Sequence, residues 1–222
     1  MHSKPRSNKM YILCVDSWRE TIVVIVMSMK KLIDPGQIKS IFFDFDSTLC
    51  SGLYFELLGS SSLDAVGRLV FGESSADWAD PWMKGDLSSR DIASYLSKHL
   101  PESEEIILAA LYDGCLNMTF SAAVYDFARR GCESGRKTAL VTANMDVFSE
   151  VVVPAHGLDT VFDLVLNTAD HRTLDKSILW RKALAAFGPD YTFASTLLID
   201  DNPRIDRSVR VAGRLCASLP GG

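Results

Sequence analysis

Four features that would assign a protein to a class at once are missing from this sequence. The apolar stretch "TIVVIVMSM", which begins at Thr21, has only nine residues, whereas a membrane-spanning helix needs about 20. Charged residues in the preceding "YILCVDSWRE" make a secretory signal unexpected. No internal repeat is present, and a net charge of −5 does not favour binding to nucleic acid. We therefore expect no membrane and no nucleic-acid partner.

Cysteine is present but does not form a recognisable pattern. There are five cysteines and no C-x-x-C pair. An odd number of scattered cysteines argues against a disulfide framework and against a structural zinc site. We expect a reducing compartment and therefore a cytoplasmic protein.

The remaining composition is that of an ordinary globular protein, with 222 residues, 47% hydrophobic and 23% charged. The charge is unevenly distributed. Residues 1–31 contain six basic and two acidic residues, and the rest of the chain contains 17 basic and 26 acidic ones. An acidic body that binds an anionic substrate would need a local cation.

Residues 1–36 precede the first clear strand and are interpreted as an N-terminal extension. They form either an extra strand or a loose segment. Another possibility is that natural translation begins at Met27 or Met29, because "MKKLIDPGQIKS" would be a normal approach to a first strand.

Four short, continuous apolar runs predict strands that are covered on both faces. They are "SIFFDFD" from Ser40, "KTALVTAN" from Lys137, "FDLVLNT" from Phe162 and "STLLIDDN" from Ser195. A fifth, weaker strand is expected at "RLCAS". Helical patterns follow the later runs, at 145–155, 176–187 and 203–212. This alternation predicts an α/β fold with a Rossmann-like parallel sheet.

A long helical insertion separates the first strand from the second. Helical patterns occur at 63–71, 88–100 and 102–115, and Ser88 or Ser89 followed by Asp91 is a plausible helix start. We assign residues 37–51 and 117–222 to the core and residues 52–116 to the insertion.

Polar side chains follow the apolar runs, at the edge of a parallel sheet where ligands bind. The first run ends in Asp44 and Asp46, the second in Thr142, and the last in Asp200 and Asp201. Taken alone, each has a plain explanation as a turn residue or a helix cap. Four carboxylates on one rim, however, need a cation, and oxygen ligands suit Mg²⁺.

Lys176 follows the third run after a loop, and taken alone it would be a solvated surface residue. Beside a hydroxyl and a metal ion, a lysine suits the oxygens of a phosphate. Asp44 and Asp46 are two apart and share a face of the strand. One carboxylate can attack phosphorus, while the other protonates the leaving oxygen.

A receiver domain of a signalling system also combines acids, a hydroxyl and a lysine. In that arrangement paired acids follow the first strand and the phosphoacceptor lies on a middle strand. Here the D-x-D pair comes first and the adjacent acids come last. This order, together with the long helical insertion, disfavours a receiver.

From residue 39 to residue 218 the chain resembles the haloacid-dehalogenase-like (HAD) hydrolase superfamily. "DFDST" resembles its first motif, D-x-D-x-T, and "ALVTAN" resembles the second, an apolar strand that ends in Thr or Ser. Lys176 in "TLDKSILWRKAL" resembles the lysine of the third motif, and "LLIDDNPRID" resembles the fourth. The order and spacing of the four motifs together are more specific than any single motif.

The resemblance implies roles for the four acids. Asp44 would be the nucleophile and a Mg²⁺ ligand. Asp46 would be the general acid and base, and its backbone carbonyl would contact the metal. Asp201 would bind Mg²⁺, and Asp200 would bind it or orient the ligands.

The resemblance also implies phosphate-binding residues and a cap. Thr142 and Lys176 would bind the phosphoryl group, and Asn144 joins them as a candidate, although many members have Asn directly after the Thr. The insertion 52–116 would be a helical cap of the C1 type. Ser47 stands where glycine is commoner, and Asp46 argues against a dehalogenase, which generally lacks the second acid.

The sequence therefore predicts a Mg²⁺-dependent phosphatase acting on a small phosphorylated metabolite through an aspartyl-phosphate. A phosphomutase of the same fold and a non-catalytic HAD-fold binding protein are the alternatives. We expect a monomer or a dimer.

Overall fold

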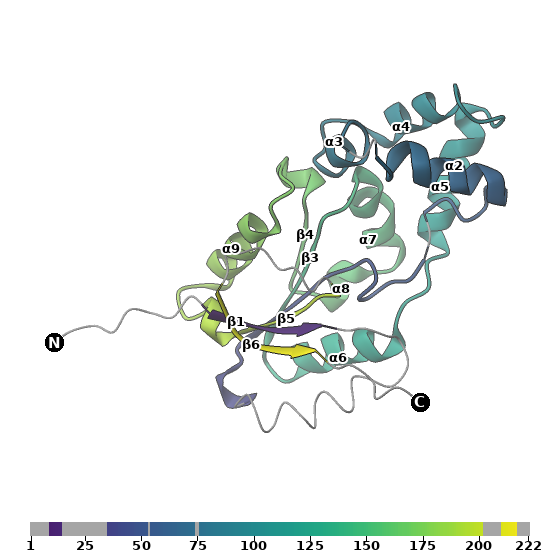
Figure 1. Cartoon of the computed structure of the whole chain (residues 1–222). Helices are drawn as coiled ribbons and strands as arrows, with labels where there is room; N and C mark the ends of the chain where they lie inside the picture. Colours follow the sequence, from purple (N-terminus) through teal and green to yellow (C-terminus); the bar gives the residue numbers. More distant parts are fainter. Residues whose placement is uncertain (1–8, 15–34, 53, 74–75, 202–209, 217–222) are drawn as a thin grey trace.

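In the computed structural model (Figure 1), the chain forms a parallel sheet of six strands with helices on both faces. The structure describes residues 9–14, 35–52, 54–73, 76–201 and 210–216. The strands are β1 (Lys9–Cys14), β2 (Ser40–Phe43), β3 (Lys137–Thr142), β4 (Leu164–Asn167), β5 (Thr196–Ile199) and β6 (Arg210–Cys216). Their order across the sheet is β4-β3-β2-β5-β1-β6, and every pair is parallel.

The predicted fold class is confirmed. The four apolar runs are β2, β3, β4 and β5. Residues 214–216 of the weak fifth strand lie in β6, and residues 217 and 218 lie outside the described part. The predicted helix at 203–212 is wrong for residues 210–212, which belong to β6, and residues 203–209 lie outside the described part.

Within the N-terminal extension, β1 pairs with both β5 and β6. The extension therefore contributes a strand to the sheet, as one of the two interpretations of these residues predicts. A chain that began at Met27 or Met29 would lack this strand.

Alternation along the strands divides the buried side chains between two faces of the sheet. In β2, Ile41 and Phe43 belong to one apolar cluster and Phe42 to the other. The helix α6 (Ala122–Glu133) packs in the first cluster, and α9 (Lys176–Phe187) packs in the second. Because both faces are covered, each strand is apolar at successive positions.

Short helical elements follow β3 in the chain. They are a π-helical turn at Phe148–Val152, α7 (Val153–Ala155) and α8 (Leu158–Val161). Three 3₁₀ turns occur at Pro35–Gln37, Ala169–His171 and Phe193–Ser195.

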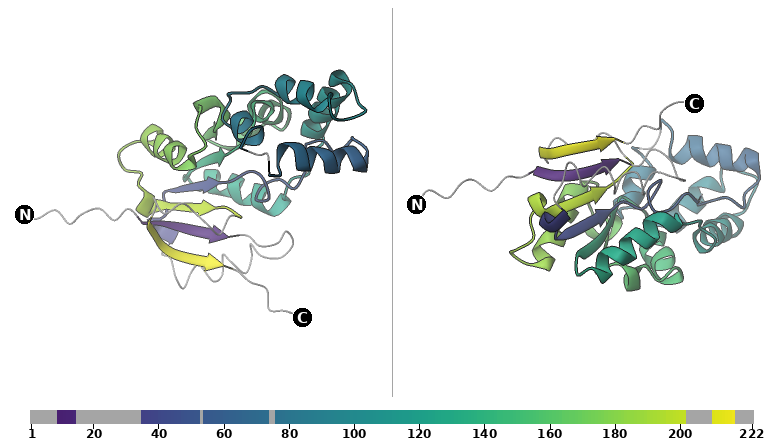
Figure 2. Two further views of the ribbon diagram at one scale, coloured as in Figure 1. Left: turned by 45° about the horizontal axis from the view of Figure 1, so that its top comes forward. Right: turned by 90° about the horizontal axis from the view of Figure 1, so that it is seen from below.

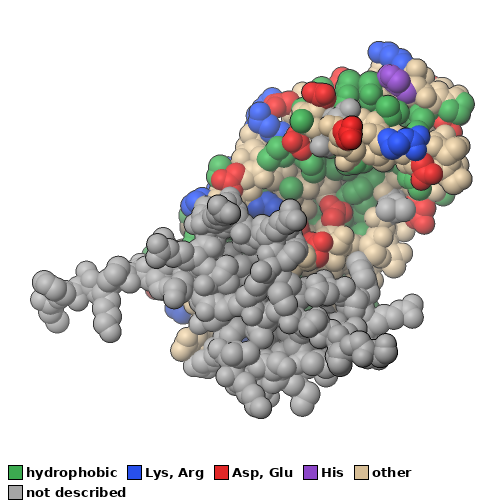
Figure 3. All heavy atoms as spheres, in the orientation of Figure 1, with side chains coloured by type: hydrophobic (Ala, Val, Ile, Leu, Met, Phe, Trp, Pro, Cys, Tyr) green, Lys and Arg blue, Asp and Glu red, His purple; other side chains and the backbone are tan. Residues whose placement is uncertain are grey.

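Four helices of segment 52–116 gather at the end of the sheet toward which the strands point (Figure 2). They are α2 (Ser60–Val70), α3 (Ala79–Met83), α4 (Ser89–Leu96) and α5 (Glu104–Leu116). Ser88 caps α4 through Asp91, at the predicted start. On the face shown in Figure 3, acidic, basic and apolar side chains are interspersed over this group.

Partly buried hydrogen bonds join this helical group to the core. The Asp146 carboxylate accepts from Trp82 Nε1 at 2.8 Å and from the Ser89 backbone N–H at 2.8 Å. Thr168 Oγ1 donates to the Met83 carbonyl at 2.7 Å. Trp82 is fully buried and Ser89 is 3% exposed, whereas Asp146 is half-buried, so the donor side of these bonds is the better shielded from water.

Among the described residues, every helix is too short or too polar to cross a bilayer.

Candidate active site

Asp44 and Asp200 lie side by side because the strands that precede them are neighbours. Phe43 of β2 is in register with Ile199 of β5. The Asp44 N–H donates to the Ile199 carbonyl at 2.9 Å and extends the ladder by one residue. The parallel pairing thus brings two acids that are distant in sequence to one edge of the sheet.

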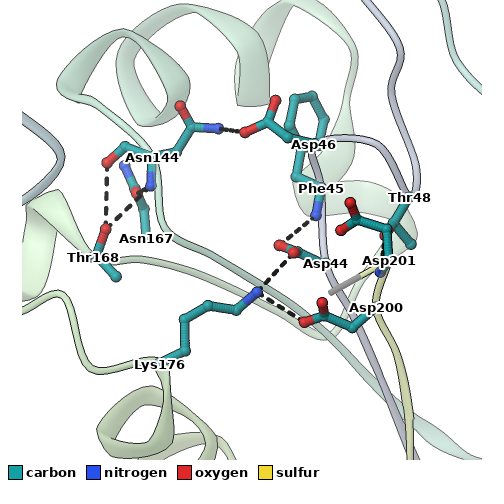
Figure 4. Close-up of polar contacts among 10 residues, drawn as sticks. All are labelled: Asp44, Phe45, Asp46, Thr48, Asn144, Asn167, Thr168, Lys176, Asp200 and Asp201. Atoms are coloured by element: carbon teal, nitrogen blue, oxygen red, sulfur yellow. Dashed lines mark hydrogen bonds and ion pairs between the residues drawn. The ribbon is translucent and has the colours of Figure 1, made fainter. Parts of the chain in front are cut away.

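Lys176 reaches both of these acids (Figure 4). Its Nζ lies 2.7 Å from Asp44 Oδ2 and 2.9 Å from Asp200 Oδ2. Lys176 is the first residue of α9, and the side chain of the preceding Asp175 accepts from the Ser177 N–H and caps the helix. The cap fixes where the helix starts and therefore the point from which the lysine extends.

Burial dominates the electrostatics of this cluster. It raises the pKa of Asp44 from 3.8 to about 6, although the Lys176 ammonium opposes the rise. Burial would lower the pKa of Lys176, but the two carboxylates outweigh it and raise that pKa. Lys176 is therefore charged at neutral pH, and two acids share one cation.

Asp46 has a different environment from Asp44. Its Oδ2 accepts from Asn144 Nδ2 at 2.9 Å, and its Oδ1 lies 3.4 Å from the Tyr54 hydroxyl oxygen. Burial, and then the charge of Asp44, raise the pKa of Asp46 from 3.8 to about 7. At neutral pH Asp46 can therefore hold or release a proton.

The acids that follow β5 are tied to the loop that follows β2. The Asp201 N–H donates to Thr48 Oγ1 at 3.1 Å, and Thr48 is 2% exposed. Burial and the neighbouring Asp200 raise the pKa of Asp201. The threonine of "DFDST" thus positions the last acid pair relative to the first.

Asp44, Asp200 and Asp201 each place a carboxylate oxygen within 4.8 Å of the others. Three oxygen donors at one point fit a hard divalent cation such as Mg²⁺. Lys176 contacts two of these acids, so one cation faces three carboxylates. The residues present therefore fit the metal that the sequence predicted.

A cavity of about 410 Å³ opens beside these acids. It is lined by Asp44, Asp46, Ser47, Thr142, Ala143, Lys176 and Asp201. The structure thus brings the predicted nucleophile, general acid, hydroxyl, lysine and one metal ligand to a single cavity.

Asn144 is the predicted phosphate-binding residue that does not line this cavity. It is fully buried, and its backbone N–H lies 3.1 Å from both Asn167 Oδ1 and Thr168 Oγ1. Its side chain contacts Asp46 and Tyr54. Its backbone N–H and its Nδ2 therefore both donate to protein atoms.

Ser47 has a left-handed backbone, with φ of +57°. Its N–H donates to the Cys50 carbonyl at 2.8 Å and closes the turn after Asp46. Such a φ favours glycine, so the serine side chain stands at the cavity at a conformational cost.

Sequence reasoning missed Tyr54. It follows the first motif in a segment without helical or strand periodicity, and its hydroxyl reaches Asn144, 90 residues later in the chain. Asn167 ends β4 and Thr168 follows it, and both accept from the backbone N–H of Asn144.

The sequence matches no protein-family model and no curated protein. Solved structures do match. A dehalogenase aligns with a TM-score of 0.55 at 13% identity, over 81% of this chain and 93% of that one. A HAD-family enzyme from Bacteroides thetaiotaomicron, solved with magnesium and inorganic phosphate, aligns with a TM-score of 0.54 at 13% identity, over 75% and 86%. The chain has the haloacid-dehalogenase-like fold.

A predicted HAD-like family hydrolase from Porphyromonas gingivalis is similar in the same way, with a TM-score of 0.51 at 17% identity over 75% of this chain and 83% of that one. The resemblance noted in the sequence is confirmed at the level of the fold. Because these identities are low, the HAD-like fold is shared while the chemistry must be argued from the site.

Proposed function

We propose that this protein is a Mg²⁺-dependent phosphatase that hydrolyses a small phosphorylated metabolite through an aspartyl-phosphate on Asp44. The observation that supports it best is the pair of unlike carboxylates at one cavity. Asp44 contacts a lysine, whereas Asp46 contacts neutral donors and has a pKa of about 7. Such a pair suits a nucleophile and a general acid.

In the first step an Asp44 carboxylate oxygen attacks phosphorus and forms a P–O bond, and the bond from phosphorus to the leaving oxygen breaks. Asp46 donates its proton to that oxygen. In the second step Asp46 takes a proton from water, whose oxygen attacks the phosphorus. The bond from Asp44 to phosphorus then breaks, and inorganic phosphate leaves.

Lys176 and Thr142 line the cavity and are assigned to the phosphoryl oxygens. Asp44, Asp200 and Asp201, together with the Asp46 carbonyl, would hold Mg²⁺. The ion would supply positive charge to offset the carboxylates and the phosphoryl oxygens.

Asp46 also favours a phosphatase over a dehalogenase. A halide leaves without a proton, whereas an alkoxide needs one, so the second acid has a use only when the leaving atom is oxygen. The Bacteroides enzyme solved with magnesium and phosphate supports the same choice.

We further propose that residues 52–116 act as a cap. Their four helices stand at the carboxyl end of the sheet, and Asp146 and Thr168 hold α3 and α4 to the core. A cap in this position would limit the size of the group attached to phosphate.

The test is hydrolysis of p-nitrophenyl phosphate with Mg²⁺. We expect activity that disappears in Asp44→Asn and in EDTA. Asp190→Asn is the matched control, because Asp190 is exposed in a turn after α9. Activity that survives in Asp44→Asn, or that ignores EDTA, would refute the proposal.

A further inference from the structure

Asn144 is oriented by two donors, and this decides which of its atoms faces Asp46. Its Oδ1 accepts from the Tyr54 hydroxyl at 2.8 Å and from the Met145 backbone N–H at 3.0 Å. A side-chain amide has one acceptor and one donor end, so Nδ2 must point the other way. That end lies 2.9 Å from Asp46 Oδ2.

The support for this arrangement is itself buried. The Asn144 N–H faces Asn167 and Thr168, and Asn167 Nδ2 donates to the Met145 carbonyl at 2.8 Å. Asn144 and Asn167 are both fully buried. Burial and the nearby Asp46 keep the pKa of Tyr54 well above 10, so its phenol remains a donor.

We propose that Asn144 and Tyr54 are positioning residues that hold the Asp46 carboxyl group ready to protonate the leaving oxygen, and that Asn144 does not bind phosphate. This inference rests on the proposed phosphatase function and refines the assignment of Asn144 made from the sequence. Because Oδ2 accepts from Asn144, the transferable proton of Asp46 is placed on Oδ1.

Tyr54 lies in segment 52–116, whereas Asn144 follows β3 in the core. The Tyr54 hydroxyl lies 2.8 Å from Asn144 Oδ1 and 3.4 Å from Asp46 Oδ1, so it contacts both members of the pair. The orientation of the general acid therefore depends on a residue from the proposed cap.

The dependence on the leaving group separates positioning from phosphate binding. p-Nitrophenolate leaves readily without a proton, whereas the alkoxide of glycerol phosphate needs one. A residue that acts through Asp46 should affect glycerol phosphate far more, but a residue that binds phosphate should affect both substrates equally. The parameter to compare is kcat/KM, since it reports the steps up to the first phosphoryl transfer.

In Asn144→Ala we expect kcat/KM for glycerol phosphate to fall by about 10- to 100-fold, and that for p-nitrophenyl phosphate by less than about threefold. Tyr54→Phe should show the same preference with a smaller loss. It removes one hydroxyl and so keeps the test available if Asn144→Ala fails to fold. Thr142→Val is the matched control and should affect both substrates equally.

Equal losses for both substrates in Asn144→Ala, or in Tyr54→Phe if only that variant folds, would overturn the inference and leave the phosphatase proposal intact. Unchanged kcat/KM for glycerol phosphate in both variants would overturn it as well. A wild-type protein that hydrolyses neither substrate with Mg²⁺ would instead overturn the proposed function, and the inference with it.

Discussion

Replacing Lys176 with methionine should destabilise the protein, and the loss should depend on pH and on Mg²⁺. Methionine keeps most of the aliphatic length but removes the ammonium group. Lys176 Nζ lies 2.7 Å from Asp44 and 2.9 Å from Asp200, whose side chains are 13% and 3% exposed. The variant would leave two buried carboxylates without their cation.

Breaking a buried ion pair by removing one partner costs about 3–5 kcal/mol, and we expect a loss of that order at pH 8. Burial already raises the pKa of Asp44 to about 6, against 3.8 for the ordinary group, and without Lys176 this pKa would rise further. An acid whose folded pKa is raised opposes folding above its unfolded value of 3.8, and the cost is complete only above the folded pKa. As the pH falls below it, Asp44 takes up a proton and the cost shrinks.

The assay is urea unfolding of both proteins at pH 8 and pH 5, with and without millimolar Mg²⁺. The difference in the free energy of unfolding should be smaller at pH 5, and Mg²⁺ should reduce it at pH 8. Lys182→Met is the matched control, because Lys182 is exposed on the same helix. A difference of less than about 0.5 kcal/mol at pH 8, no larger than that of an ordinary surface change, would refute the reasoning.

Three further changes test separate parts of the structure by urea unfolding. Ser47→Gly should raise the free energy of unfolding by about 0.5–1 kcal/mol by relieving the φ of +57°, and a loss would show that the turn is unstrained. Asp146→Ala should cost about 2–4 kcal/mol, because the buried Trp82 Nε1 would lose its acceptor; a cost below 1 kcal/mol would contradict this. Burial would raise the pKa of Asp163, but hydrogen bonds from Lys137 and Thr138 outweigh it and lower that pKa. Asp163→Asn should therefore cost about 1 kcal/mol at pH 7, after allowance for screening of the half-exposed Lys137. Since a lowered folded pKa stabilises above the unfolded value of 3.8, the difference should vanish well below pH 3.8, and a constant difference would exclude the ion pair as its cause.

The sheet and the main contacts of its edge could be predicted because they depend on local pattern. Strands covered on both faces are continuously apolar, so β2 and β5 stand out in the sequence. Once they are parallel neighbours, the acids that follow them must meet. The helix predicted at 176–187 has these bounds in α9, because Asp175 caps its first turn.

The hydrogen bonds between segment 52–116 and the core could not be predicted, because they join residues that are far apart in the chain. Tyr54 and Asn144 are 90 residues apart, and Trp82 and Asp146 are 64 apart. In the sequence, Asp146 resembles an ordinary acid at the start of a helix, and Tyr54 lies in a segment without helical or strand periodicity. Which donor such a residue finds is decided by packing and not by local pattern.

The neighbours of β1 in the sheet could not be predicted for a similar reason. An apolar run indicates a strand but not its neighbours, and β1 lies between β5 and β6, close to neither in sequence. Strand pairing over such distances is set by the whole sheet.

The central claim is that Asp44 becomes phosphorylated during turnover, and it can be measured directly. The protein would be mixed with Mg²⁺ and p-nitrophenyl phosphate, quenched in acid within milliseconds and digested. The mass of the peptide that contains Asp44 would then be measured by mass spectrometry. Asp46→Asn, which should slow release of the phosphoryl group, is the variant in which it should accumulate most. We predict one added phosphoryl group on that peptide, absent from Asp44→Asn. Turnover with no added mass on the Asp44 peptide, or with the phosphoryl group on another residue, would contradict the account.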